Sequence, residues 1–482
     1  MPAGQAAADG HRLDIGRPTA DAPPSDAPLL DEPGPCAETA SLEALLVWVA
    51  EASAGKILSS RLITGGNRYQ SWAVDIAAPD GRTLPLYLRH QMPRPPSAEP
   101  YTLEREAQIY RVIDGRGIRA PRLVAVHPDG QTVLSERVPG RAEFRRLINP
   151  EHRVTVVQDF VQTLADLHKL DIARVTLDGL SARSSMADCV AREIAVWQAM
   201  YEETHSRDPL IDLALNWLTT NMPRPGEPVV LVHGDAGPGN FLFEDGHMTA
   251  LLDWELAHLG DPMEDIAWFS MRCVMEPVPG FGDRLAEYER AMGRPIDRFR
   301  VLYHRVLVST RIVILRHRNV TGEPGNSIVS RGLNRRLLVD ALAGATGVKL
   351  APFVAVHAPE TARAGLYDGI IADLRTKMAD RSDDPVVVAS AKNAAKVLKY
   401  LSACDRLGPA IEAADLAALT GALGTQPASA EEGQALVVQR LADNSLPIET
   451  VLQTFSGIVQ RAAQLSAASS GGISGRTFPD LP

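Results

Sequence analysis

The sequence predicts an α+β protein in which a β-rich N-terminal part is followed by a helical part and a separate all-α domain. Strand-like runs separated by turn residues are concentrated before residue 138, whereas apolar residues recur at helical spacing from Gly140 onward. No clear strand signal interrupts the helical pattern after residue 360. A length of 482 residues is enough for several domains with sizeable cores.

The domain boundaries follow from shifts in composition. Residues 1 to about 38 are rich in Ala, Pro, Asp and Gly, and a Ser/Gly-rich stretch begins at Ser466. Such segments bury too little apolar surface to offset the entropy lost on ordering. The predicted parts are a flexible tail at 1–40, the β-rich part at 41–138, the helical part at 139–350, the all-helical domain at 360–466 and a second flexible tail at 467–482.

Composition excludes several classes of protein. The net charge of -10 argues against general affinity for nucleic acid or acidic membranes. Four cysteines without a CxxC pair indicate reduced thiols in a cytoplasmic protein and no zinc site. No apolar run approaches about 18 residues, and the N-terminus lacks the basic and apolar regions of a secretory signal. We therefore expect a cytoplasmic protein without a nucleic-acid or membrane partner.

The elements can be placed along the chain from periodicity and turn residues. In the first part we expect a helix at 42–52, a hairpin at 57–76, strands at 84–89, 121–126 and 132–138, and a helix at 103–113. In the second part we expect helices at 154–170, 190–203, 209–221 and 266–273, with further helices across 284–348. The last domain is expected to hold helices at 366–378, 386–407, 430–442 and 448–465.

The stretch from Val229 to Phe269 concentrates the polar residues suited to chemistry. A short β-branched strand at 229–232 precedes Asp235 and Asn240, and a hairpin around Glu244-Asp245-Gly246-His247 precedes Asp253. Carboxylate, amide and carboxylate suit phosphoryl transfer, because Asn240 and Asp253 can hold Mg²⁺ against ATP phosphates while Asp235 accepts the proton of an attacking hydroxyl. The alternative is that these residues only form turns.

The spacing resembles the catalytic loop and metal-binding aspartate of protein kinases. The form His233-Gly234-Asp235-x4-Asn240, followed by Asp253-Trp254-Glu255, is most similar to the aminoglycoside phosphotransferase (APH) superfamily of small-molecule kinases. The resemblance implies a bilobal protein-kinase-like fold over about residues 41–345, with ATP between a β-rich lobe and a helical lobe. It implies an ATP- and Mg²⁺-dependent phosphotransferase with an alcohol group as the acceptor.

The same resemblance assigns the nucleotide site. The hairpin turn Gly65-Gly66-Asn67 would cover the phosphates with backbone N–H groups, although such turns are commonly structural. Arg89 stands where kinases have a phosphate-binding lysine, and Glu106 would pair with it unless it is a solvated helix charge. Glu136 and Val138 fall at the hinge, whose backbone would bind adenine.

The acceptor is suggested by Leu88-Arg89 and by basic residues. That pair is similar to a branch of kinase domains, some fused to acyl-CoA dehydrogenases, that includes 4-hydroxyacyl-CoA kinases accompanied by a small helical protein. Basic side chains would suit an anionic acceptor, although solvated helix faces also account for them. The candidates are Arg311, Arg316, Arg318, Arg335, Lys392 and Lys396.

Three functions therefore stay open from the sequence. The leading hypothesis is a kinase of a hydroxyacyl-CoA in the catabolism of a hydroxy acid. The first alternative is a kinase of another small alcohol, such as an aminoglycoside or other antibiotic, or a sugar. The second is an inactive nucleotide-binding scaffold. The oligomeric state is open and includes a homodimer.

Overall fold

The computed structural model describes residues 41–63, 69–92, 97–223, 228–318, 324–473 and 475–482. The chain divides into two compact units, Met1–Leu45 and Leu46–Pro482. Of the first unit, residues 41–45 are described, and they include the start of helix α1 (Leu42–Ala52), which agrees with the predicted helix. The predicted tail at 1–40 lies outside the described residues. The second unit carries every feature discussed below.

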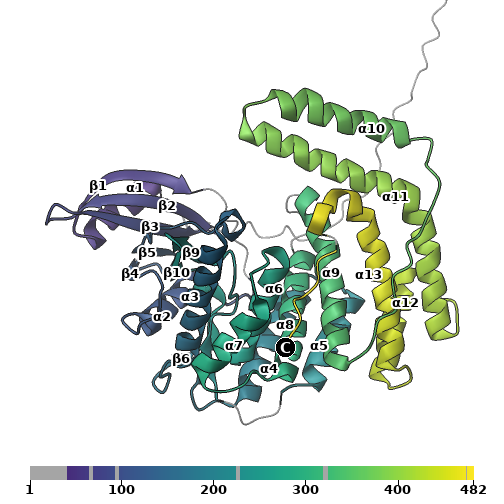
Figure 1. Cartoon of the computed structure of the whole chain (residues 1–482), viewed down its shortest axis with the longest axis horizontal. Coiled ribbons are helices and arrows are strands. Elements are labelled where there is room, and N and C mark those ends of the chain that lie inside the picture. The colour runs from purple at the N-terminus through teal and green to yellow at the C-terminus, as the bar shows by residue number, and fades with distance from the viewer. Residues whose placement is uncertain (1–40, 64–68, 93–96, 224–227, 319–323, 474) are drawn as a thin grey trace, which may run out of the picture. The chain divides into compact units, whose positions relative to one another are not determined.

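The β-rich part forms one antiparallel sheet with the strand order β1-β2-β3-β5-β4 (Figure 1). Its strands are β1 (Lys56–Ile63), β2 (Tyr69–Ala77), β3 (Thr83–Gln91), β4 (Leu123–Val126) and β5 (Thr132–Glu136). All the strands predicted for this part are present. The glycine turn of the predicted hairpin, Gly65-Gly66-Asn67, lies outside the described residues.

Helix α2 (Leu103–Ile113) packs against this sheet through its apolar face. The hydroxyl of Thr102 caps the helix by accepting from the backbone N–H of Arg105. Leu103 and Ala107 of the helix cluster with Val133 of β5. Burial of these side chains fixes α2 against the sheet. It thereby orients Arg105 and Glu106, which lie between Leu103 and Ala107 in the sequence.

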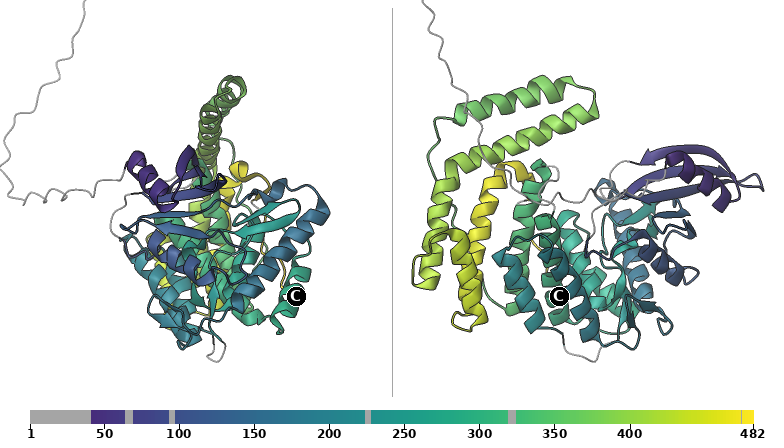
Figure 2. Two further views of the ribbon diagram at one scale, coloured as in Figure 1. Left: turned by 90° about the vertical axis from the view of Figure 1, so that its left-hand side faces the viewer. Right: turned by 180° about the vertical axis from the view of Figure 1, so that it is seen from behind.

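The second part is mainly helical, as predicted (Figures 1 and 2). Its helices are α3 (Pro150–His168), α4 (Met186–Glu202), α5 (Pro209–Thr220), α6 (Pro262–Met275), α7 (Phe281–Met292), α8 (Arg298–Arg318) and α9 (Pro324–Thr346), with a 3₁₀ turn η1 (Phe144–Arg146). In the described part of the chain, no helix is both long and apolar enough to cross a membrane.

Short strands frame the stretch between α5 and α6. The predicted hairpin is present as β9 (Phe241–Glu244) and β10 (His247–Leu251). The predicted strand β8 (Val230–Val232) pairs with β11 (His258–Gly260), which was not predicted because three residues are too few to show a period. A further small hairpin joins β6 (Thr176–Leu177) to β7 (Leu180–Ser181).

The regular secondary structure of the C-terminal part is all helical in its described residues. It contains α10 (Ala364–Asp373), a π-helical turn η3 (Leu374–Met378), η4 (Ala379–Arg381), α11 (Pro385–Leu423), α12 (Ala430–Ala442), α13 (Ile448–Ser470) and η5 (Gly471–Ile473). Helices α11 and α13 pack against α9 of the preceding part. Their apolar side chains join the same hydrophobic cluster as the helical part.

Helix α11 is longer than predicted. The predicted helix ends at Leu407, whereas the observed helix continues to Leu423 with Pro409 inside it. Proline removes one backbone hydrogen bond and is unfavourable there. Burial of Leu407, Ile411 and Leu419 in the contacts with α12 and α13 offsets this cost.

The end of the chain differs from the expected flexible tail. The guanidinium of Arg305 donates to the carbonyl of Pro479 at 2.7 Å and lies over the ring of Phe478, 4.8 Å from its centroid. Arg298 donates to the carbonyls of Leu481 and Pro482. These contacts hold the last residues against α8, and the low complexity of the preceding Ser/Gly stretch gave no sign of them.

An aromatic cluster fills the centre of the helical part and provides a test of the core. The ring of Phe160, which is 0% exposed, lies 5.4 Å from Phe241 and 5.1 Å from Phe269 between centroids. We expect Phe160→Ala to lower the free energy of unfolding by about 3–5 kcal/mol. Phe299→Ala, at a side chain that is 49% exposed, should cost less than about 1 kcal/mol. Urea titrations that gave both variants the same loss would contradict this assignment of the core.

Candidate functional site

The loop after β8 is held by one buried carboxylate. Asp265 of α6 accepts from the backbone N–H groups of His233 and Gly234 at 2.8 and 2.9 Å, and from Nε2 of His168 at 2.9 Å. Gly234 has a φ of +79°, and a Cβ there would lie 2.3 Å from the carbonyl oxygen of Leu256. The loop is therefore fixed in direction immediately before Asp235.

The side chain of Asp235 is held by two neighbours. Nε of Arg272 donates to Oδ1 at 2.8 Å, the same guanidinium donates to Oδ2 through Nη2, and Nδ2 of Asn240 donates to Oδ2 at 2.9 Å. Burial alone would lower the pKa of Arg272, but the carboxylates of Asp235 and Asp253 raise it above its ordinary value. A permanently charged fork therefore holds the Asp235 carboxylate in one orientation.

Hydrogen bonds to the backbone of Leu252 place the next residue, Asp253, close to Asp235 and Asn240. The N–H of Leu252 donates to the carbonyl of Asn240 at 2.7 Å, and Nε2 of His233 donates to the carbonyl of Leu252 at 2.8 Å. Asp253 itself adopts the left-handed region, with φ 67° and ψ 58°, which is unfavourable for a residue with a side chain. The structure thus brings Asp235, Asn240 and Asp253 together.

The sheet contributes a cation to the same place. Arg89 of β3 forms an ion pair with Glu106 of α2, with 2.6 Å between Nη2 and Oε1, and the two side chains are 11% and 1% exposed. Burial alone would lower the pKa of Arg89, but Glu106 and, more weakly, Tyr110 and Asp253 raise it above its ordinary value. Asp253 therefore lies within the electrostatic reach of the guanidinium from the sheet and of the one from α6.

Helix α2 also ties the sheet to the segment after Asp253. The guanidinium of Arg105, next to Glu106, donates to the carbonyls of Glu255 and Ala257 at 3.0 and 2.7 Å and to the carboxylate of Asp178. Hydrogen bonds to a buried charged group are among the stronger ones in proteins. One helical turn thus connects Arg89 of the sheet with the Asp253 segment.

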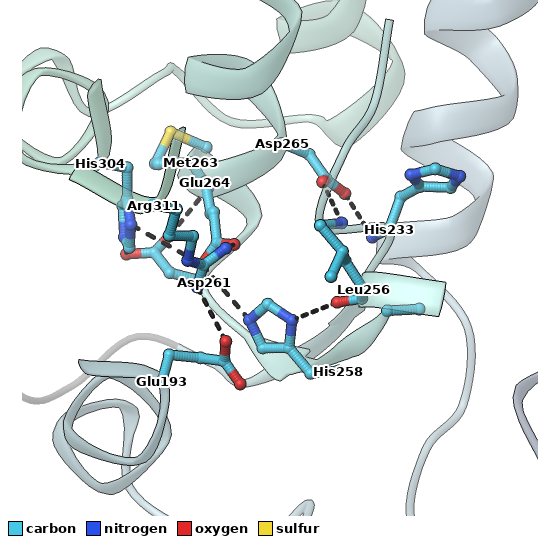
Figure 3. A network of polar contacts seen from close by, with 12 residues as sticks. Glu193, His233, Leu256, His258, Asp261, Met263, Glu264, Asp265, His304 and Arg311 are labelled. Atoms are coloured by element: carbon cyan, nitrogen blue, oxygen red, sulfur yellow. Dashed lines mark hydrogen bonds and ion pairs between the residues drawn. The ribbon is translucent and has the colours of Figure 1, made fainter. Parts of the chain in front are cut away.

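A buried ionic network lies behind the loop (Figure 3). The guanidinium of Arg311 pairs with Glu193 at 2.9 Å and with Glu264, while Nε2 of His258 lies 3.3 Å from Glu264. Burial alone would lower the pKa of His258, but Glu193 and Glu264 raise it to about 9. The network joins α4, β11, α6 and α8, and the same helix α6 carries Asp265 to the loop.

The predicted role of Arg311 in acceptor binding is wrong. Its side chain is 1% exposed and both ends of its guanidinium are held by carboxylates. The sequence showed a basic residue on a helix, but it did not show that Glu193 and Glu264 would face it. Removing one partner of a buried charged set is strongly destabilising, so Arg311 has a structural role.

The other predicted basic residues are dispersed. Arg318 pairs with Glu99 and Glu203 at 3.2 and 3.0 Å. Arg335 pairs with Asp208, and Arg316 lines the same cavity as Arg335. Lys392 and Lys396 lie on α11, exposed and half-buried respectively, and neither lines that cavity.

The predicted hinge positions lie at the end of β5. The backbone N–H of Glu136 donates to the carbonyl of Arg122 at 2.8 Å, and its side chain is exposed. Val138 follows outside the strand and is half-buried. Between them, Arg137 pairs with Asp75 of β2 at 2.6 Å. Adenine binding at this segment stays a prediction.

Arg272 is the site residue that the sequence reasoning missed. It stands seven residues after Asp265, which is two turns along α6 and on the same face. A Cβ on Gly237, whose φ is +145°, would lie 2.7 Å from Cβ of Arg272, so the loop passes close over this helix. The seven-residue spacing was the available signal, but it gained meaning only once Asp265 was known to hold the loop.

Comparison with known proteins identifies relatives of this region. Residues 61–300 match the sequence model of the phosphotransferase enzyme family (APH). Acyl-CoA dehydrogenase family member 11 from Homo sapiens is 28% identical over 196 residues, which are 38% of this chain and 25% of that protein. Acyl-CoA dehydrogenase family member 10 from Mus musculus is 28% identical over 184 residues, which are 36% of this chain and 17% of that protein. The chain therefore spans a quarter or less of these relatives.

A solved structure is similar in fold. A candidate aminoglycoside phosphotransferase from Ralstonia eutropha superposes with a TM-score of 0.50 at 20% identity, covering 64% of this chain and 99% of the other. At this identity the likeness establishes the arrangement of sheet and helices.

The contact between Arg272 and Asp235 can be tested by substitution. We expect Arg272→Met to lower kcat by about 10- to 100-fold, because a catalytic group that is held loosely loses its productive orientation. The KM for ATP should change little. Arg272→Lys should recover part of the loss, because the ammonium group keeps a positive charge beside Asp235. Arg192→Gln, at an exposed arginine of α4, is the matched control. A kcat of Arg272→Met equal to that of Arg192→Gln would exclude the positioning role.

The ionic network predicts a pH dependence of stability. The pKa of His258 is raised from 6.5 to about 9 in the folded protein. Its contribution to stability is therefore complete below about pH 6.5 and is lost as the pH rises toward 9. We expect the Tm to fall between pH 6.5 and 9, and to fall less steeply in His258→Gln.

The matched control for this measurement is His357→Gln, at an exposed histidine. It should keep the pH dependence of the unmodified protein. If His258→Gln and His357→Gln had the same slope of Tm against pH, His258 would not be the group responsible.

Proposed function

Residues 61–300 of this chain belong to the phosphotransferase enzyme family (APH), and on that premise we propose that the protein transfers the γ-phosphoryl group of ATP to the hydroxyl group of a hydroxyacyl-CoA. The observation that carries the proposal is the meeting of Asp235, Asn240 and Asp253 around one loop. A carboxylate beside an amide and a second carboxylate supplies both a proton acceptor and oxygen ligands.

Asp235 is the group that would receive the acceptor hydroxyl. Its carboxylate is 13% exposed and is held by Arg272 and Asn240, so it keeps one direction without having to reorganise when the hydroxyl arrives. In a phosphoryl transfer, this group orients the hydroxyl and takes its proton as the oxygen forms its bond to phosphorus and the bond to the leaving diphosphate breaks.

Asn240 and Asp253 fit the requirements of a magnesium site. The amide nitrogen of Asn240 is used in donating to Asp235, which leaves Oδ1 of the same amide as an available ligand. Asp253 adopts a left-handed backbone conformation that glycine would adopt more easily. A carboxylate residue at this strained position supports a functional role for the carboxylate. Mg²⁺ commonly takes one or two such protein ligands together with phosphate oxygens. When bound, it would neutralise charge on the phosphates.

Arg89 is suited to hold the nucleotide phosphates. The Glu106 carboxylate orients it from α2 and keeps it charged, and Asp253 lies within its electrostatic reach. A guanidinium can bind two phosphate oxygens at once. In this proposal, α2 aligns Arg89 with Asp253. Glu106 of this helix holds Arg89, and Arg105 holds the segment that follows Asp253.

The acceptor is proposed from two further observations. The relatives that match this chain are named acyl-CoA dehydrogenase family members, and Arg316 and Arg335 lie in one basic cavity. A CoA thioester is strongly anionic through its phosphates, so basic side chains would favour it over a polycationic antibiotic. These observations support a hydroxyacyl-CoA as the first acceptor to test.

The role of Asp235 can be tested with an isosteric change. We expect Asp235→Asn to leave Mg-ATP binding within about threefold and to lower kcat by about 10²- to 10⁴-fold, because the amide cannot accept the proton. Asp368→Asn, at an exposed aspartate of α10, makes the same chemical change away from the site and should keep full activity. Turnover of Asp235→Asn near that of Asp368→Asn would remove Asp235 as the proton acceptor.

The acceptor class can be tested by a screen of ADP release with Mg-ATP. Matched pairs of free hydroxy acids and their CoA thioesters are compared, with aminoglycosides and sugars alongside. We expect release with the thioesters only. Release with free alcohols or antibiotics alone would keep the phosphotransferase and reject the CoA thioester. Binding of ATP without turnover of any acceptor would instead favour a nucleotide-binding scaffold.

A further inference from the structure

A cavity lies among helices of the helical and C-terminal parts. It has a volume of about 290 Å³ and is lined by residues of α8, α9, α11 and α13. Figures 1 and 2 show α8, α9 and α13 side by side, and α9 packs directly on α8, α11 and α13. Gly332 of α9 brings the helices close, since a Cβ there would lie 3.2 Å from the hydroxyl oxygen of Ser466 in α13. None of these lining residues belongs to the loop that carries Asp235.

The charge of this cavity is strongly positive. Three guanidinium groups line it, from Arg316 of α8 and from Arg331 and Arg335 of α9, against the single carboxylate of Asp208. Asp208 pairs with Arg335. Among the described residues, neither Arg316 nor Arg331 has a hydrogen-bond or ion-pair partner. Both side chains are exposed, so two positive charges line one concave site without a carboxylate partner in the described part of the chain.

The remaining walls supply neutral polar groups and apolar surface. Tyr400 of α11 and Asn334 of α9 bring a hydroxyl and an amide, while Val313 and Ile328 provide aliphatic surface. Burial raises the pKa of Tyr400, so its hydroxyl stays protonated and can donate a hydrogen bond. Guanidinium groups, a hydroxyl donor and an apolar wall together suit an anion that carries a non-polar part.

We propose that this cavity binds the phosphate group of a small organic phosphate. Two uncompensated guanidinium groups match the charge of a phosphate monoester near neutral pH, and each can bind two of its oxygens. A volume of about 290 Å³ accommodates a phosphate with a small apolar group, so a CoA molecule would place only one phosphate-bearing end there. The proposal rests on the proposed function where it shares Arg316 and Arg335 with the acceptor assignment, and it names a phosphate group as what they bind; none of the lining residues is assigned to ATP or to phosphoryl transfer.

The test uses phenyl phosphate as the probe, with phenyl sulfate as a singly charged analogue of similar shape. Binding to the full chain is measured by calorimetry in the presence of saturating Mg-ADP, so that the nucleotide site is occupied. We expect one molecule of phenyl phosphate to bind, and phenyl sulfate to bind more weakly. Arg316→Gln/Arg331→Gln should weaken phenyl phosphate binding by at least about tenfold, because two charge-assisted contacts are lost.

The matched control is Arg290→Gln, at an exposed arginine of α7, which should bind phenyl phosphate like the unmodified protein. Circular dichroism and a thermal melt show whether each variant is folded. Equal binding by Arg316→Gln/Arg331→Gln and the unmodified protein, or no saturable binding by the unmodified protein, would overturn the proposal. The assay requires no turnover, so its outcome is independent of the acceptor that the enzyme phosphorylates.

A competition experiment distinguishes two sources of the phosphate. If CoA displaces phenyl phosphate, and Arg316→Gln/Arg331→Gln raises the KM of the thioester acceptor, the site receives a phosphate of the acceptor. If CoA does not displace the probe, the site receives the phosphate of a separate small metabolite. Both results support a phosphate site in this cavity.

Discussion

The side chain of Asp265 is the contact on which the candidate site depends. One fully buried carboxylate accepts from two consecutive backbone N–H groups of the loop and from His168. A buried charge is tolerated only when it is fully paired, so the loop, α3 and α6 cannot move independently. Two turns further along α6, Arg272 holds Asp235 itself. The backbone and the side chain of the loop are thus positioned by one helix.

The buried ions behind α6 extend this constraint into the helical part. Arg311 connects α8 to Glu264 on α6 and to Glu193 on α4. The sheet is aligned separately, because α2 carries Glu106 toward Arg89 and Arg105 toward the segment after Asp253. The site is therefore assembled from two rigid supports that meet at Asp253. This arrangement suits a reaction in which positioning and electrostatics supply most of the catalysis.

The sequence predicted the fold class and the residues that meet at the site, because both leave local signals. Asp235, Asn240 and Asp253 lie in turns between short strands, and Arg89 and Glu106 lie on a strand and a helix with clear periods. Arg272 escaped prediction because its role depends on a contact across the fold. The structural role of Arg311 escaped prediction for the same reason, because its carboxylate partners come from two other helices. The order of the last residues of the chain was also missed, because the arginines that bind them lie on α8. Helix α11 continues past Pro409 because tertiary packing outweighs a local preference.

In the proposed reaction, Asp235, Asn240 and Asp253 form a phosphoryl-transfer site whose acceptor is the hydroxyl group of a hydroxyacyl-CoA. The most direct measurement is phosphorus NMR of the products formed from Mg-ATP and a hydroxyacyl-CoA, supported by mass spectrometry. We expect ADP together with a new phosphate ester on the acyl chain, in equal amounts. Release of inorganic phosphate without an ester, or no change in ATP, would contradict it.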